Sequence, residues 1–110
     1  MNKAIIVSIL QEHDFSIDYF NYANERCTAI KKYTPCGEDW FEEFSWKSAK
    51  AFTEELENFV DNFDIDEQIE VWLPLRGTRG VPEHVTDLIE DAKWKLEQLE
   101  QLLLEIKGVK

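Results

Sequence analysis

The sequence is poor in basic residues: 12 lysines and arginines stand against 23 aspartates and glutamates in 110 residues, a formal net charge of -11. Nucleic-acid binding rests on basic side chains that neutralise phosphates, and anionic membranes attract the same side chains. We therefore expect no direct binding to nucleic acid or to a membrane surface. No stretch approaches the roughly 20 apolar residues of a membrane span.

Cysteine is also scarce. Cys27 and Cys36 are too few for a disulfide scaffold and lack the paired C-x-x-C spacing of a zinc site. The short apolar stretch 4–10 is followed at once by polar residues, without the cleavage site of a secretory signal. These features predict a cytoplasmic protein with two reduced thiols.

Catalytic signatures are missing too. No nucleophile has a neighbouring base at a recognisable spacing, so we expect no enzyme, no catalytic residue and no cofactor. Asp61, Asn62, Asp64 and Asp66 resemble fragments of a calcium loop. The central glycine and the glutamate at position 12 of such a loop do not fall in place, so we expect no metal site.

What the chain does have is apolar residues, 44% of the total, including seven Phe, four Trp and three Tyr. This content is too high for a disordered acidic tail and suits a single domain, 1–110, with a modest core. The periodicity predicts an α+β fold.

The first half of the chain predicts a helix and a small sheet. Residues 3–13 carry Ile and Leu at helical spacing, although the β-branched run 5–7 keeps a strand as the alternative. Period-two patterns then predict strands at about 15–23, 27–33 and 40–46, joined as an antiparallel meander.

The second half predicts three helices packed on one sheet face. An apolar stripe over 48–63 follows Ser48, a suitable N-cap, and Asp64 has capping-box spacing for a short helix that Pro74 ends. The last helix is expected to begin near Pro82 and end near Gly108. Its apolar residues repeat at spacings of four and three, a heptad seam. The part of the seam that could form a homodimer is Leu96, Leu99, Leu103 and Ile106.

The negative charge is concentrated in one region. Residues 38–70 contain twelve acids and only two lysines, a net charge of -10, whereas residues 1–37 are neutral and 71–110 carry -1. Solubility requires charge but not its concentration, so this region is either a solvated face or a surface that competes for a basic groove. The candidate partner-binding residues are Glu54, Glu55, Glu57, Asp61, Asp64, Asp66, Glu67 and Glu70.

One loop stands out by its positive charge. Arg76 and Arg79 lie in the glycine-containing segment 75–81. The glycines favour a chain reversal between two helices, and the arginines either pair with nearby carboxylates or contact an anionic group on a partner.

Part of the chain, residues 59–107, resembles a known group of proteins. The residues that carry the resemblance are the run 63–66, Trp72, the run 80–82, and Asp87, Leu88 and Asp91 ahead of a leucine-rich helix. This pattern resembles small acidic accessory proteins of phages and integrative elements of Gram-positive bacteria, of the anti-CRISPR and anti-restriction type. The resemblance implies a counter-defence role in which some members mimic nucleic acid.

Two functional hypotheses result. In the first, the protein is an acidic inhibitor that binds a host nucleic-acid-processing effector, most simply a CRISPR-Cas nuclease, and blocks its basic channel. In the second, it is a structural or regulatory protein that homodimerises through its last helix, and the acids only solvate it.

Overall fold

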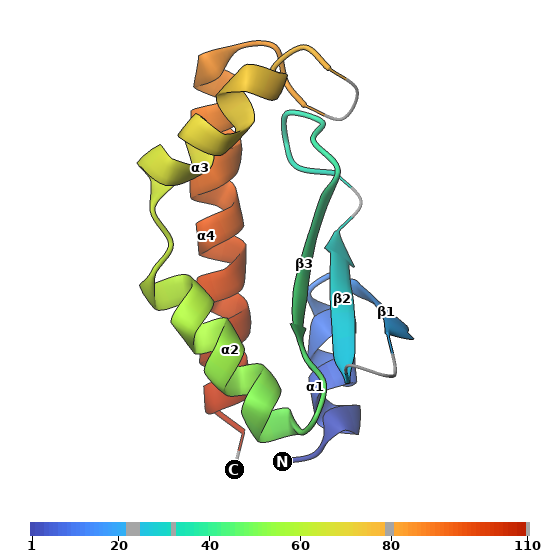
Figure 1. Ribbon diagram of the computed structural model, residues 1–110. Coiled ribbons are helices and arrows are strands. Elements are labelled where there is room, and N and C mark those ends of the chain that lie inside the picture. The colour runs from blue at the N-terminus through green and yellow to red at the C-terminus, as the bar shows by residue number, and fades with distance from the viewer. Residues whose placement is uncertain (22–24, 32, 79–80, 110) are drawn as a thin grey trace.

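The protein is described from a computed structural model that covers residues 1–21, 25–31, 33–78 and 81–109 (Figure 1). The chain forms the expected α+β fold, a helix followed by a three-stranded sheet and then helices. The elements in chain order are α1 (Lys3–Glu12), β1 (Ser16–Asn21), β2 (Arg26–Lys31), β3 (Trp40–Ser45), α2 (Ala49–Asp61), α3 (Ile65–Trp72), η2 (Leu73–Leu75) and α4 (Val85–Lys107).

The N-terminal segment is a helix, not the alternative strand. The Asn2 side chain caps α1 by accepting a hydrogen bond from the Ile5 backbone N–H at 3.1 Å. Ile6, Ile9 and Leu10 are buried. Their spacing of three and one places them on a single helix face, so the helical periodicity outweighs the β-branched run.

The sheet is an antiparallel meander in the order β1-β2-β3, as predicted. Its strands are shorter than expected, and the predicted strand residues 22, 23 and 32 lie outside the described residues. In the register of β2 and β3, Cys27 faces Phe44 and Ala29 faces Glu42. The inner face is therefore mainly apolar, but it contains one carboxylate.

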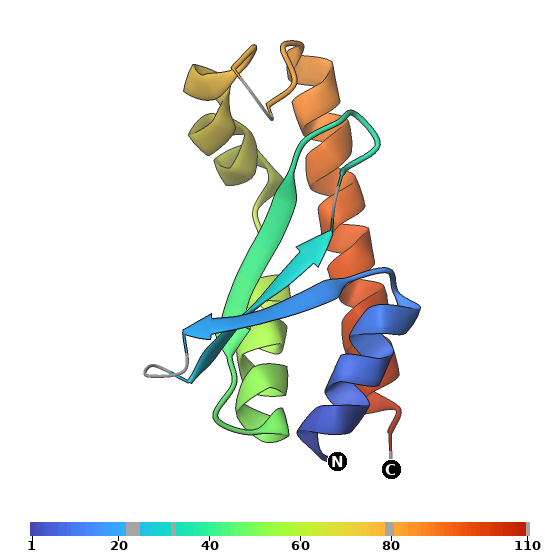
Figure 2. The ribbon, with the colours of Figure 1, turned by 90° about the vertical axis from the view of Figure 1, so that its right-hand side faces the viewer.

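Helices α2, α3 and α4 lie on the same side of the sheet (Figure 1). Figure 2 shows the strands crossing in front of α2 and α4, and α1 lies beside the C-terminal half of α4. One core cluster joins residues of α1, the sheet, α2 and α4. The opposite sheet face is open, and Phe41 on it is 66% exposed.

Local signals set the bounds of α2 and α3. The Ser48 hydroxyl accepts from the Ala51 N–H at 3.0 Å, and the Asp64 carboxylate accepts from the N–H groups of Asp66 and Glu67. Pro74 sits within the single 3₁₀ turn that follows α3. These caps and the proline confirm the predicted helix ends.

The last helix begins later than predicted, at Val85 instead of near Pro82. The Pro82 carbonyl accepts from the Gly77 N–H at 3.4 Å, and the Val81 N–H donates to Thr78. These hydrogen bonds hold Pro82 to Gly77 and Val81 to Thr78, so Pro82 lies in the connection before α4. None of the helices in the described ranges combines the length and apolarity needed to cross a bilayer.

The predicted heptad seam is a second correction. Leu99, Leu103 and Ile106 are at most 9% exposed and pack in the chain's own core, while Leu96 is half-buried. Three of the four seam residues are already covered by α1, α2 and the sheet within one molecule. The seam is therefore not a free surface for a homodimer.

Candidate functional site

The eight predicted partner-binding acids divide into paired and unpaired residues. Glu55 is the most engaged: its carboxylate binds the Arg26 guanidinium at 2.8 and 3.0 Å and accepts from the Ser45 N–H at 2.8 Å. It ties α2 to the sheet. Glu55 therefore has a structural role, and its part in binding a partner stays a prediction.

Two more of the eight have a cation nearby on the surface. Glu57 binds the Lys107 ammonium at 2.7 Å, which joins α2 to the end of α4. Glu54 lies 3.9 Å from Lys50 one turn earlier, with both side chains largely exposed. Such exposed pairs contribute only up to about 1 kcal/mol, so both glutamates stay available to a strong partner.

The other five acids form a surface that we call the acidic ridge. It runs from the end of α2 along α3, two helices that follow each other along one side of α4 (Figure 1). Each of the five is exposed, and within the described part of the chain none forms an ion pair. The acidic ridge consists of Asp61, Asp64, Asp66, Glu67 and Glu70.

Calcium-loop chemistry is not needed to explain the acids at the α2–α3 junction. Asp64 is occupied as the cap of α3, with its Oδ1 2.9 Å from the Asp66 N–H. The Asn62 side-chain amide donates to the Asn58 carbonyl at 2.8 Å. Because helix capping uses these polar groups, the pattern serves helix termination.

A second polar arrangement lies inside the protein, where the β2–β3 connection meets α4. Asp91 is fully buried, and its two oxygens accept from the Thr34 hydroxyl at 2.6 Å and the Cys36 N–H at 3.1 Å. Thr34 Oγ1 accepts in turn from the Glu38 N–H at 2.8 Å. Gly37 takes φ +92°, which favours glycine, and completes the turn.

This turn delivers Glu38 to a lysine on α4. The Lys95 ammonium lies 2.6 Å from Glu38 Oε1, and the two side chains are 4% and 2% exposed. It also lies 5.3 Å from the centre of the Trp72 ring, within cation–π range. We call Thr34, Glu38, Asp91 and Lys95 the buried polar cluster. It pins the β2–β3 connection, α3 and α4 together.

Sequence reasoning missed this cluster because it looked for a stripe of apolar residues. The buried residues of α4 include two charged side chains among apolar ones: Leu88, Asp91, Ala92, Lys95, Leu99, Leu102, Leu103 and Ile106. Asp91 and Lys95 occupy core positions. Their helical spacing from Leu88 and Leu99 places them on the same face as these leucines, and this spacing is visible in the sequence. The partners of both charges come from the β2–β3 connection, which is distant in the sequence, so only the structure identifies them.

Above the buried polar cluster is a pocket of about 250 Å³ between β3, α3 and α4. Its walls are largely aromatic, and its polar groups come from four elements. The lining is Asp39, Trp40, Phe41, Glu42, Phe59, Gln68, Val71, Trp72 and Lys95. Such a mixture of aromatic wall and few polar groups is typical of sites that hold one small group.

Glu42 is the carboxylate on the pocket wall. It accepts a hydrogen bond from the Trp40 indole N–H at 2.9 Å. Burial raises the pKa of Glu42, and the Trp40 hydrogen bond and the charge of Lys95 oppose that shift. Burial also raises the pKa of Glu38, against the opposite effect of Lys95. Burial therefore disfavours the ionised form of both carboxylates, and a positive charge nearby would stabilise that form.

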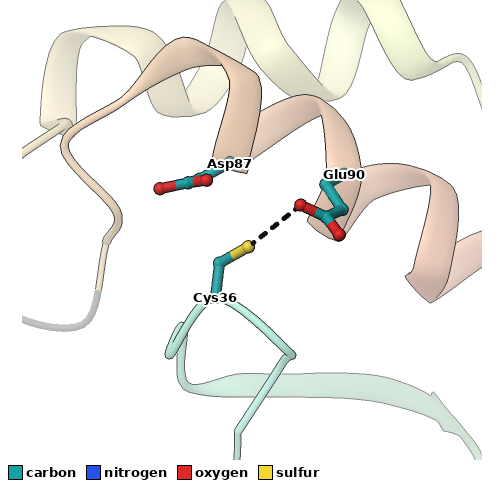
Figure 3. A group of neighbouring side chains, drawn as sticks. All are labelled: Cys36, Asp87 and Glu90. Carbon is teal, nitrogen blue, oxygen red and sulfur yellow. Dashed lines mark hydrogen bonds between the residues drawn. The ribbon is translucent and has the colours of Figure 1, made fainter.

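A third arrangement contains the thiol of Cys36, which faces Asp87 and Glu90 on α4 (Figure 3). Its Sγ lies 3.7 Å from Glu90 Oε2. Loss of solvation, a hydrogen bond with Asp91 and the nearby carboxylates raise the pKa of Cys36 to about 12. The thiol thus stays protonated at neutral pH and is a weak nucleophile, since the thiolate is the reactive form.

The structure describes only part of the arginine loop. Arg76 is exposed and follows η2, while Arg79 and Gly80 lie outside the described residues.

Comparison with known proteins gives no further guide: no family model, curated protein or solved structure matches the chain.

Proposed function

We propose that the protein is an acidic inhibitor that acts in the cytoplasm of a bacterial host. It binds a nucleic-acid-processing effector, of which a CRISPR-Cas nuclease is the leading candidate, and blocks the channel that receives nucleic acid. The partial resemblance of residues 59–107 to acidic accessory proteins of mobile elements supports this class of partner.

One observation carries the proposal. The five carboxylates of the acidic ridge are exposed and have no cation partner in the described part of the chain, although lysines and arginines elsewhere pair with other acids. Neighbouring carboxylates on a helix repel one another, which costs some helix stability. A basic groove that normally holds phosphates would relieve this repulsion.

The ridge also has apolar residues beside its charges. Val71 at the end of α3 is 60% exposed, and Leu73 and Leu75 in η2 are 37% and 45% exposed. Apolar contacts at the centre of an interface add affinity that does not depend on salt. We therefore expect a complex that weakens with ionic strength without vanishing.

The test is a charge reversal placed where it spares the fold. Asp61→Lys and Glu70→Lys lie towards the C-terminal ends of α2 and α3, where a positive charge suits the helix dipole. The double variant is added to purified Cas nucleases of Gram-positive bacteria, and target-DNA binding is measured by gel shift. The wild type should block DNA binding, and the double variant should not.

The matched control is Asp18→Lys with Glu97→Lys, which changes the net charge equally at exposed sites on β1 and α4. This control should inhibit as the wild type does. Equal inhibition by the ridge variant and the wild type would refute the acidic ridge as the binding surface. Failure of the wild type to inhibit any nuclease in the panel would remove the proposed target class.

A further inference from the structure

We infer that the pocket between β3, α3 and α4 binds the guanidinium of one arginine side chain, supplied by the basic partner. This inference deepens the proposed function and rests on it for the source of the arginine. The pocket itself can be tested without the partner. Four observations support it: its negative charge, its lysine that is already paired, its aromatic wall and its size.

The charge of the pocket is negative. Asp39 and Glu42 line it, and the Lys95 ammonium is its one positive group among the described residues. That ammonium is already neutralised by Glu38 at 2.6 Å. Neither Asp39 nor Glu42 forms an ion pair among the described residues, so the pocket is complementary to a positive group.

Lys95 does not make the pocket an anion site. Its side chain is 4% exposed, and its ammonium is held between Glu38 and the face of Trp72. An incoming anion would have to displace Glu38, which is itself buried. The carboxylate of Glu42 is more accessible, since Trp40 donates to its Oε1 and leaves the other oxygen without a hydrogen bond in the described structure.

The wall of the pocket is suited to a flat cation. Trp40, Phe59 and Trp72 line it. A guanidinium can stack on an aromatic ring while it donates two parallel hydrogen bonds to a carboxylate. Trp72 on α3 and Glu42 on β3 offer those two features from two different elements that line the pocket.

The size of the pocket limits the occupant. At about 250 Å³ it is smaller than the roughly 300–1,000 Å³ of pockets for drug-sized ligands. It suits one side chain and excludes a nucleotide. Its position beside α3 also places it next to the acidic ridge, so a basic surface lying on that ridge would bring arginines to its mouth.

The experiment uses N-acetyl-L-arginine amide as the probe and the ¹⁵N-labelled full chain. The indole N–H signals of Trp40 and Trp72 and the amide signals of β3 and α3 report on the pocket. We expect saturable shifts confined to these residues. N-acetylglycine amide, which lacks the guanidinium, should give none.

Two variants locate the binding. Glu42→Gln keeps an acceptor for the Trp40 indole and removes the charge, and should weaken probe binding by about tenfold or more, as loss of a charge-assisted hydrogen bond predicts. Asp18→Asn, an equal charge change on β1, should leave the affinity unchanged.

The inference is overturned by shifts that do not saturate, by equal shifts with the glycine probe, or by equal affinity in the Glu42→Gln and Asp18→Asn variants. These results are independent of the inhibition assay. If the pocket does not bind the arginine probe, the result of the ridge variant in the inhibition assay is unaffected. If the ridge variant inhibits the partner as well as the wild type does, the proposed function is refuted, and the probe titration is unaffected.

Discussion

The acidic ridge and the buried polar cluster contain the same kind of side chain in opposite surroundings. On the ridge, Asp66, Glu67 and Glu70 face solvent and have no cation partner among the described residues. In the cluster, Glu38 and Asp91 are at most 2% exposed, and each accepts hydrogen bonds from specific donors. A carboxylate in the core must be paired to be tolerated, whereas one in water need not be.

The comparison separates two uses of negative charge. The buried acids fix the position of the β2–β3 connection on α4 and so define the pocket wall. Of the ridge acids, Asp64 caps α3, whereas none of the five forms an ion pair in the described structure and several repel one another. Substitutions in the two regions should therefore differ most in their effect on the free energy of unfolding.

The largest expected effect is that of Lys95→Met. It leaves Glu38 buried without its cation, and breaking a buried ion pair on one side costs about 3–5 kcal/mol. Urea unfolding should show this loss. The double variant Lys95→Met with Glu38→Gln should recover part of it, because the uncompensated charge is gone. A single variant as stable as the wild type would show that the cluster is not a structural element.

The apolar counterpart of this prediction is Leu99→Ala. Leu99 is 1% exposed in the core, and its truncation should cost about 2–5 kcal/mol in thermal or urea unfolding. The matched control on the same helix is Leu104→Ala, at a side chain 73% exposed, which should change stability by less than about 0.5 kcal/mol. Similar losses at both positions would contradict the packing of α4 described above.

A smaller effect, of opposite sign, is expected for Glu42→Gln. Burial raises the pKa of Glu42, so the folded protein holds this proton to higher pH than the unfolded chain. The contribution of Glu42 to stability therefore falls as pH rises above the usual carboxyl range. The glutamine variant should be more stable than the wild type at neutral pH, and the difference should shrink towards acidic pH. Urea unfolding measured across that range checks the sign, and a difference that grows on acidification would refute it.

The smallest effect on stability is expected from the ridge variant Asp61→Lys with Glu70→Lys. Both positions are exposed and without ion pairs in the described structure, so the free energy of unfolding should change by less than about 1 kcal/mol. Circular dichroism and urea unfolding check this. A large loss of stability would mean that the ridge acids, like the buried ones, hold the fold together.

Much of the fold follows from local pattern. Ser48 and Asp64 cap the helices that their spacing predicted, and the apolar stripe of α2 buries Phe52 and Leu56. The bounds of the helices were less predictable. The Pro82 carbonyl accepts a hydrogen bond from the Gly77 N–H, and α4 begins only at Val85. No hydrophobic periodicity in the sequence indicates this hydrogen bond. The candidate site was predicted in part. Its exposed acids follow from the helical stripe, but the pairing of Glu55 with Arg26 depends on a strand far away in the sequence.

The sequence by itself determined the order of helices and strands and the region in which negative charge gathers, because both depend on near neighbours along the chain. Only the tertiary structure decided which charges are free. It places Glu55 against Arg26 and Lys95 against Glu38, pairs separated by 29 and 57 residues, and leaves the acidic ridge unpaired in the described residues. The reason is physical: the cost of a charge depends on burial and on partners in space, and neither can be read from its position in the chain.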